Sequence, residues 1–135
     1  MIQRPQTLYL LGATLFNFAV FFTTLYSRAM AGPVQWIGWG LALSLSLVMI
    51  ISFAAIFLYR DRLKQLSVVK FATYIQIVAL AAVAGVIFSL GGLGTYLLWE
   101  VVGIVLVFLS LLLLWLAGRG IKKDEDLVKS MDRIR

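Results

Sequence analysis

The sequence contains no cysteine and no histidine. The chain therefore has no thiol nucleophile and no disulfide, and it lacks the usual ligands of haem and of nearly every zinc, copper or iron site. Serine–histidine pairs, intramembrane aspartate pairs and glycine-rich phosphate loops after a strand are missing too. We therefore expect no cofactor, and the sequence does not specify an enzyme.

Charge is scarce as well. Charged residues make up 13% of the 135 residues and hydrophobic residues 62%, with a mean hydropathy of +0.99. A soluble domain carries about 25% charged residues. The composition therefore predicts an integral membrane protein in the lipid bilayer. In that setting the net charge of +6 indicates contact with anionic lipid on the cytoplasmic side, and we expect no nucleic acid partner.

Four apolar runs predict four transmembrane helices, because backbone groups in lipid must pair within their own segment. Each run is long enough for a hydrocarbon core of about 30 Å. The connections are short, so helices adjacent in sequence should pack antiparallel. We predict an all-α fold, a four-helix transmembrane bundle of up-down-up-down topology over residues 1–120, with spans at about 8–26, 36–59, 68–90 and 93–117.

The first run also has a rival interpretation as a signal peptide. It follows a basic residue and ends near Ala29-Met30-Ala31, which resembles a cleavage pattern. We disfavour this interpretation, because the run is longer than the about 7–15 apolar residues of a signal peptide. Three further spans would survive cleavage in any case.

Lysine and arginine gather on one side of the predicted bundle. Four spans place the N-terminus, the second loop and the C-terminal tail together, and these segments hold 11 of the 12 basic residues. Only Arg28 lies on the other side. This asymmetry predicts that both termini are cytoplasmic.

Glu100 is the only acidic residue inside an apolar span. An ionisable group in a membrane segment is a functional candidate, for example for carrying a proton or binding a cation. Arg28 is the only basic residue on the same side. We favour a structural pair between Glu100 and Arg28, or a solvated Glu100, over transport or catalysis.

Asn17 and Gln76 lie in the interior of the first and third runs. Buried amides in lipid usually hydrogen-bond to another helix. We favour such helix–helix contacts over a polar path, because two amides and one carboxylate line a channel only sparsely.

Stripes of small residues in two of the runs allow close helix approach, within the bundle or against another protein. The stripes consist of Ala81, Gly85 and Ser89 in the third run and of Gly40, Ser44 and Ser52 in the second.

The last segment, residues 121–135, is predicted to form a short amphipathic cytoplasmic helix. Its acidic cluster at 124–126 opposes an anionic membrane surface. We therefore leave open whether the helix lies on lipid or docks on a protein. The residues that fall on its apolar face are Ile121, Leu127, Val128, Met131 and Ile134.

The two ends of the chain carry a distinctive pattern, MIQRPQTLYL at the start and KKDEDLVKSMDRIR at the close. The pattern resembles a family of small four-helix integral membrane proteins of the Bacteroidota and their relatives, described as a domain of unknown function. Pro5 and Met131 depart from it. The resemblance implies the fold, the topology and a multi-pass location in the bacterial inner (cytoplasmic) membrane, and it implies no activity.

Both ends face the cytoplasm in this topology, so we expect them to form one surface that contacts a partner protein. The predicted surface consists of Gln3, Arg4, Gln6, Lys122, Lys123, Asp124, Glu125, Leu127, Val128, Asp132 and Arg133.

We therefore expect a non-catalytic scaffold or accessory subunit of an inner-membrane complex, partnered by another membrane protein or by further copies of itself. The alternative is a small oligomeric transporter or channel that uses Glu100 with Asn17 or Gln76. Small multidrug exporters have a similar length and span number, but their key carboxylate lies in the first helix. Here Glu100 lies in the last predicted span.

Overall fold

The computed structural model describes residues 5–31, 35–58, 60–89 and 97–134. These ranges are helical apart from short turns and contain no strand, which confirms the predicted all-α class. A few side chains within them are outside the description, those of Pro5, Thr24, Arg28, Ser89, residues 97–100 and Ile134. The helices are α1 (Pro5–Val20), α2 (Thr24–Ala31), α3 (Gln35–Ile56), α4 (Arg62–Ser89) and α5 (Leu97–Ile134).

Three of these helices are long and apolar enough to cross a membrane. They are α3, α4 and α5, whose most apolar stretches have mean hydropathies of 2.2, 2.1 and 2.8. A fourth crossing requires α1 and α2 to act together as one span that is bent by 53°.

The first apolar run, predicted as one span over 8–26, is therefore divided between two helices. The break follows Val20, where the backbone N–H groups of Phe21, Phe22 and Thr23 donate to carbonyls three residues back. The Thr23 hydroxyl also donates to the Val20 carbonyl at 2.6 Å. These tight turns end α1, and α2 starts in a new direction.

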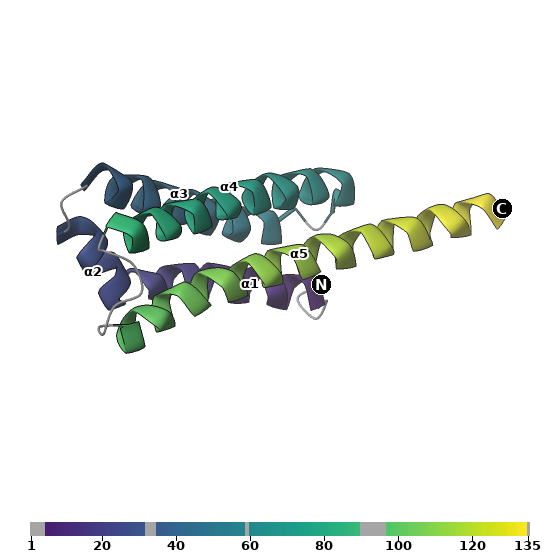
Figure 1. The fold of residues 1–135 in the computed structure, drawn as a ribbon. Helices are drawn as coiled ribbons and strands as arrows, with labels where there is room; N and C mark the ends of the chain where they lie inside the picture. Colours follow the sequence, from purple (N-terminus) through teal and green to yellow (C-terminus); the bar gives the residue numbers. More distant parts are fainter. Residues whose placement is uncertain (1–4, 32–34, 59, 90–96, 135) are drawn as a thin grey trace.

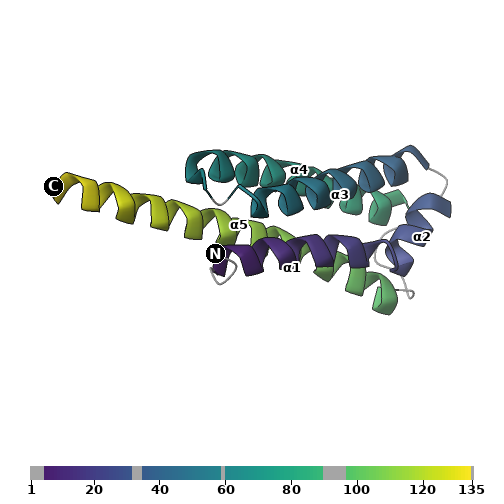
Figure 2. The same ribbon diagram turned by 180° about the vertical axis from the view of Figure 1, so that it is seen from behind.

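The helices form two layers, α3 with α4 and α1 with α5 (Figure 1). Across the layers, α1 packs against α3 and α4 packs against α5, while the short α2 contacts α3 and α5. The view from behind shows the same pairs (Figure 2). The start of α1, the α3–α4 turn and the free end of α5 lie at one end of the molecule, and α2 lies at the other.

The apolar core consists of two clusters along the bundle axis. The cluster towards the α3–α4 turn consists of Leu10, Ala13, Val48, Ala55, Val69, Ala72, Leu114, Ala117 and Ile121. The cluster towards α2 consists of Val20, Leu25, Ala29, Leu41, Leu45, Ala79, Val83, Val86 and Val107. In α1, α4 and α5 a buried polar residue separates the two clusters, at Asn17, Gln76 and Ser110 respectively.

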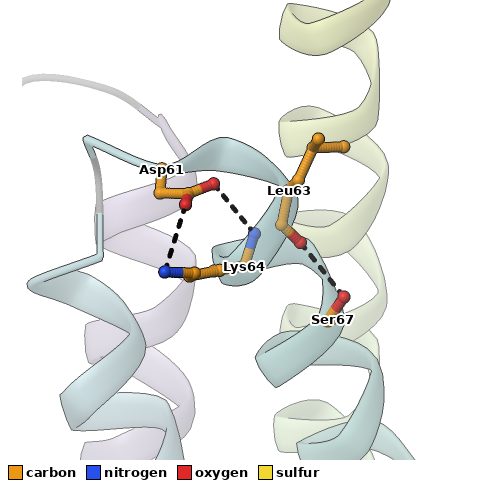
Figure 3. Close-up of polar contacts among 4 residues, drawn as sticks. All are labelled: Asp61, Leu63, Lys64 and Ser67. Atoms are coloured by element: carbon orange, nitrogen blue, oxygen red, sulfur yellow. Dashed lines mark hydrogen bonds and ion pairs between the residues drawn. The ribbon is translucent and has the colours of Figure 1, made fainter.

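Asp61 caps the start of α4. Its carboxylate accepts a hydrogen bond from the backbone N–H of Lys64 at 3.3 Å and lies 3.6 Å from the Lys64 ammonium (Figure 3). A side-chain acceptor at this position satisfies one of the free N–H groups in the first turn of a helix. One turn further along α4, the Ser67 hydroxyl donates to the Leu63 carbonyl at 3.1 Å.

The C-terminal tail is not a separate helix. It continues α5, which runs without a break through Gly118 and Gly120 to Ile134. Glycine disfavours helix by about 1 kcal/mol relative to alanine, but it does not break the hydrogen-bond ladder. The close approach of α1 accounts for Gly120, where a Cβ atom would lie 3.1 Å from the Gln6 Cγ.

The small-residue stripes differ in their contacts. A Cβ atom on Gly40 would meet no described residue within 4 Å, and one on Gly85 would make ordinary contacts with Ile37. The tightest approach is instead at Gly38, where a Cβ atom would lie 2.6 Å from the carbonyl oxygen of Ala29 in α2. Gly38 therefore sets the distance between α2 and α3.

We expect Gly38→Ala to lower the melting temperature of the detergent-solubilised protein, because the new methyl group meets backbone that cannot rotate away. Gly40→Ala is the matched control two residues along the same helix. It should be neutral or stabilising, since alanine favours helix by about 1 kcal/mol over glycine. Thermal unfolding followed by circular dichroism measures both. Equal melting temperatures for the two variants would contradict the close contact.

Candidate functional site

A layer of hydrogen-bonded polar side chains crosses the interior between the two apolar clusters. The Asn17 amide in α1 donates to the Ser110 hydroxyl in α5 at 2.8 Å. That hydroxyl donates to the Ala13 carbonyl in α1 at 3.3 Å. Asn17 and Ser110 are both fully buried, so this pair joins α1 to α5 without contact with solvent.

Gln76 adds α4 to the same layer. Its amide nitrogen donates to the Asn17 side-chain oxygen at 3.2 Å and to the Val107 carbonyl at 3.0 Å. Within the described part of the chain, the Gln76 side-chain oxygen is buried and accepts no hydrogen bond. The two amides predicted from the sequence therefore meet each other, and the arrangement joins three helices.

Ser110 and Gln65 were missed in the sequence. A serine in an apolar run carries little signal, because its hydroxyl commonly bonds to its own helix, as Ser46 does to Ala42. Gln65 is buried, and its amide donates to the Ala55 carbonyl near the end of α3 at 2.9 Å. Its position in a charged loop gave no indication of burial.

A second polar contact lies where the start of α1 packs against the part of α5 that leaves the bundle. The Gln6 amide nitrogen donates to the Asp124 carboxylate, although the two residues are 118 positions apart. Gln6 is only 7% exposed, and its side-chain oxygen is buried and has no hydrogen-bond partner among the described residues. The structure therefore brings together one residue from each half of the predicted partner-binding surface.

A surface pocket of about 690 Å³ lies beside this contact. Side chains of α1, α4 and α5 converge on it, and three of them are basic. We call it the boundary pocket, and it is lined by Gln6, Tyr9, Arg62, Leu116, Arg119, Gly120, Lys123, Asp124, Leu127 and Val128.

The remaining residues of the predicted surface are arranged along the free end of α5. Lys122, Asp132 and Arg133 are exposed, while Glu125 is half-buried. Glu125 borders a second hollow that is otherwise lined by residues 60–63. Gln3 and Arg4 lie outside the described residues.

The other two predicted candidates are Arg28 and Glu100. Arg28 lies on α2 and Glu100 on the first turn of α5, and both side chains are outside the part of the chain that is described. Within the described part, no group of three or more acidic side chains that could hold a metal ion was found.

We expect Ser110→Ala to destabilise the fold, because it leaves the Asn17 amide without its buried acceptor. Interhelical hydrogen bonds in membrane proteins contribute about 0.6 kcal/mol on average and up to about 1.7 kcal/mol. Ser46→Ala is the control, since that hydroxyl bonds only within its own helix. Unfolding in mixed dodecyl maltoside and SDS micelles measures both variants. If Ser46→Ala lowered the free energy of unfolding as much as Ser110→Ala, the role of Ser110 in joining α1 to α5 would be refuted.

Comparison with protein-family models matches residues 2–134 to a domain of unknown function (DUF4293). Comparison with curated proteins and with solved structures gave no match. The family match covers nearly the whole chain, including both distinctive ends, and confirms the expected resemblance to a family of unknown function. The chain belongs to the family described as a domain of unknown function, DUF4293.

Proposed function

We propose that this chain is a non-catalytic integral membrane protein, a scaffold or accessory subunit of a membrane complex. The observation that carries the proposal is the free end of α5, which projects beyond every other helix (Figure 1). It extends a row of exposed apolar side chains away from the bundle.

The outer surface supports membrane insertion. Large apolar side chains are exposed around the bundle, although a soluble monomer rarely exposes contiguous apolar patches of more than a few hundred Å². Surrounding lipid would cover these exposed side chains. Examples from α1, α3, α4 and α5 are Leu15, Phe53, Phe71 and Phe108, each about half exposed. With α1 and α2 as one bent span, the chain crosses the bilayer four times in up-down order.

The basic residues support the orientation. Arg62 at the start of α4 and the row from Arg119 to Arg133 on α5 lie at the end where α1 starts. The positive-inside rule assigns such an end to the cytoplasm. Both termini are then on the cytoplasmic side of the inner membrane.

The length of α5 supports a projecting contact surface. Its 38 residues correspond to about 57 Å at 1.5 Å per residue. A hydrocarbon core of about 30 Å takes only about 20 residues. About half of the helix therefore extends past the core.

The projecting part has an apolar stripe without a cover in the described structure. Leu127 and Met131, one turn apart, are 52% and 67% exposed, and Val128 is 36% exposed. Gln6 holds the helix just before this stripe through Asp124. A stripe at helical spacing on a fixed helix suits packing against another helix.

The interior polar layer supports a structural rather than a transporting role. Asn17, Gln76 and Ser110 bond to one another and to backbone at full burial. Transport through Glu100 remains a prediction from the sequence alone.

We expect Leu127→Ser combined with Met131→Ser to release a stoichiometric partner, because the two changes remove the exposed stripe and keep every charge. The measurement is capture of tagged, natively expressed protein in mild detergent, with quantitative mass spectrometry of the co-purified subunits.

The matched control is Asp126→Asn with Lys129→Gln, which removes one charge of each sign from the same stretch. The control should keep the partner. Recovery of the unsubstituted protein alone, as a homo-oligomer, would overturn the accessory role. If both double variants lost the partner equally, the apolar stripe would not be the surface that contacts it.

A further inference from the structure

We propose that the boundary pocket binds the headgroup of an anionic phospholipid from the cytoplasmic leaflet. This inference uses the membrane insertion proposed above but needs no protein partner. It rests on the charge of the pocket, on its height in the bundle and on its apolar wall.

Three basic side chains from two helices line the pocket. Arg62 comes from α4, and Arg119 and Lys123, one turn apart, come from α5. Among the described residues that line the pocket, the single carboxylate is that of Asp124, which accepts a hydrogen bond from the Gln6 amide. The pocket therefore carries a net positive charge, and arginine and lysine together can hold a phosphate.

The positive charge continues around α5. A neighbouring groove of about 320 Å³ between α4 and α5 shares Arg119 and adds Lys70 and Lys122. Arg119 thus belongs to both hollows. Of the acidic residues at 124–126, Asp124 lines the boundary pocket. Asp126 lines an adjoining hollow with Arg119 and Lys123, and Glu125 lines another with Arg62.

The position of the pocket along the bundle axis corresponds to the headgroup region of the membrane. Along α5 the exposed apolar residues Leu112 and Trp115 precede Arg119, which follows Trp115 by one turn. The Arg119 guanidinium lies 5.3 Å from the centre of the Trp115 ring, which lines the neighbouring groove. Tyr9 lines the boundary pocket itself. Tryptophan and tyrosine are enriched at the membrane interface.

The apolar part of the lining distinguishes a lipid from a free anion. Leu116 and Tyr9 lie on the bundle side of the basic residues, where acyl chains would run towards the hydrocarbon core. The other apolar lining residues, Leu127 and Val128, lie on the projecting side and belong to the exposed stripe of α5. Basic pockets between membrane helices on the cytoplasmic side are suited to anionic headgroups. A soluble phosphate would match the charges but leave this wall uncovered.

The test is native mass spectrometry of the purified full-length protein in dodecyl maltoside. Phosphatidylglycerol or phosphatidylcholine of identical acyl chains is added, and the lipid that stays bound after release from the detergent is measured. We expect phosphatidylglycerol to be retained preferentially. Arg119→Gln and Lys123→Gln should each lower that retention about fivefold. Lys129→Gln, an exposed change outside the pocket, should leave it unchanged.

Asp124→Asn is expected to change phosphatidylglycerol retention in the opposite direction. It removes the one negative charge in the lining and keeps an acceptor for Gln6, so phosphatidylglycerol retention should rise. This result does not depend on whether the arginine or lysine variants fold.

Three outcomes would overturn the proposal. They are equal retention of the two lipids, a loss in Lys129→Gln equal to that in Lys123→Gln, and displacement of the lipid by millimolar glycerol phosphate, which would assign the site to a soluble anion. The measurement uses purified protein, so failure to capture a protein partner would leave it unaffected.

Discussion

The polar layer formed by Asn17, Gln76 and Ser110 sets the register of this helical fold. An amide in an apolar interior is costly unless it is hydrogen-bonded, so its partners must lie at matching heights on neighbouring helices. The bonds from Asn17 to Ser110 and from Gln76 to Asn17 meet this condition for α1, α4 and α5. The apolar clusters on either side could pack in several registers, because contacts between apolar surfaces have little directional preference.

The register set by this layer reaches the proposed functional end. The helices α1 and α5 run in opposite directions (Figure 1). Residues nearer the start of α1 therefore contact residues nearer the end of α5. Asn17 bonds to Ser110, and Gln6, earlier in α1, bonds to Asp124, later in α5. Because the second contact fixes α5 where it leaves the bundle, the boundary pocket and the exposed stripe, which have Leu127 and Val128 in common, keep a defined position. The proposed lipid site and the proposed protein contact share this support.

Part of the candidate site could be predicted from the sequence and part could not. Asn17 and Gln76 stand out because an amide in an apolar run needs a partner. Ser110 and Gln65 do not, because serine usually bonds to its own helix and glutamine is ordinary in a charged loop. The break after Val20 was missed for a related reason. The run stays apolar through Phe22, and hydropathy does not register the turn that Thr23 helps to close.

The sequence by itself determined the all-helical class, the apolar segments and the family, because hydropathy, charge distribution and terminal motifs are properties of the linear chain. Only the tertiary structure decided which polar groups pair, how α1 and α2 divide the first run, and that the tail extends α5 instead of forming its own helix. Those features depend on close approach between distant segments, as where Gly103 lies against Leu25 and Thr23. A local pattern carries no information about which distant residue will be its neighbour.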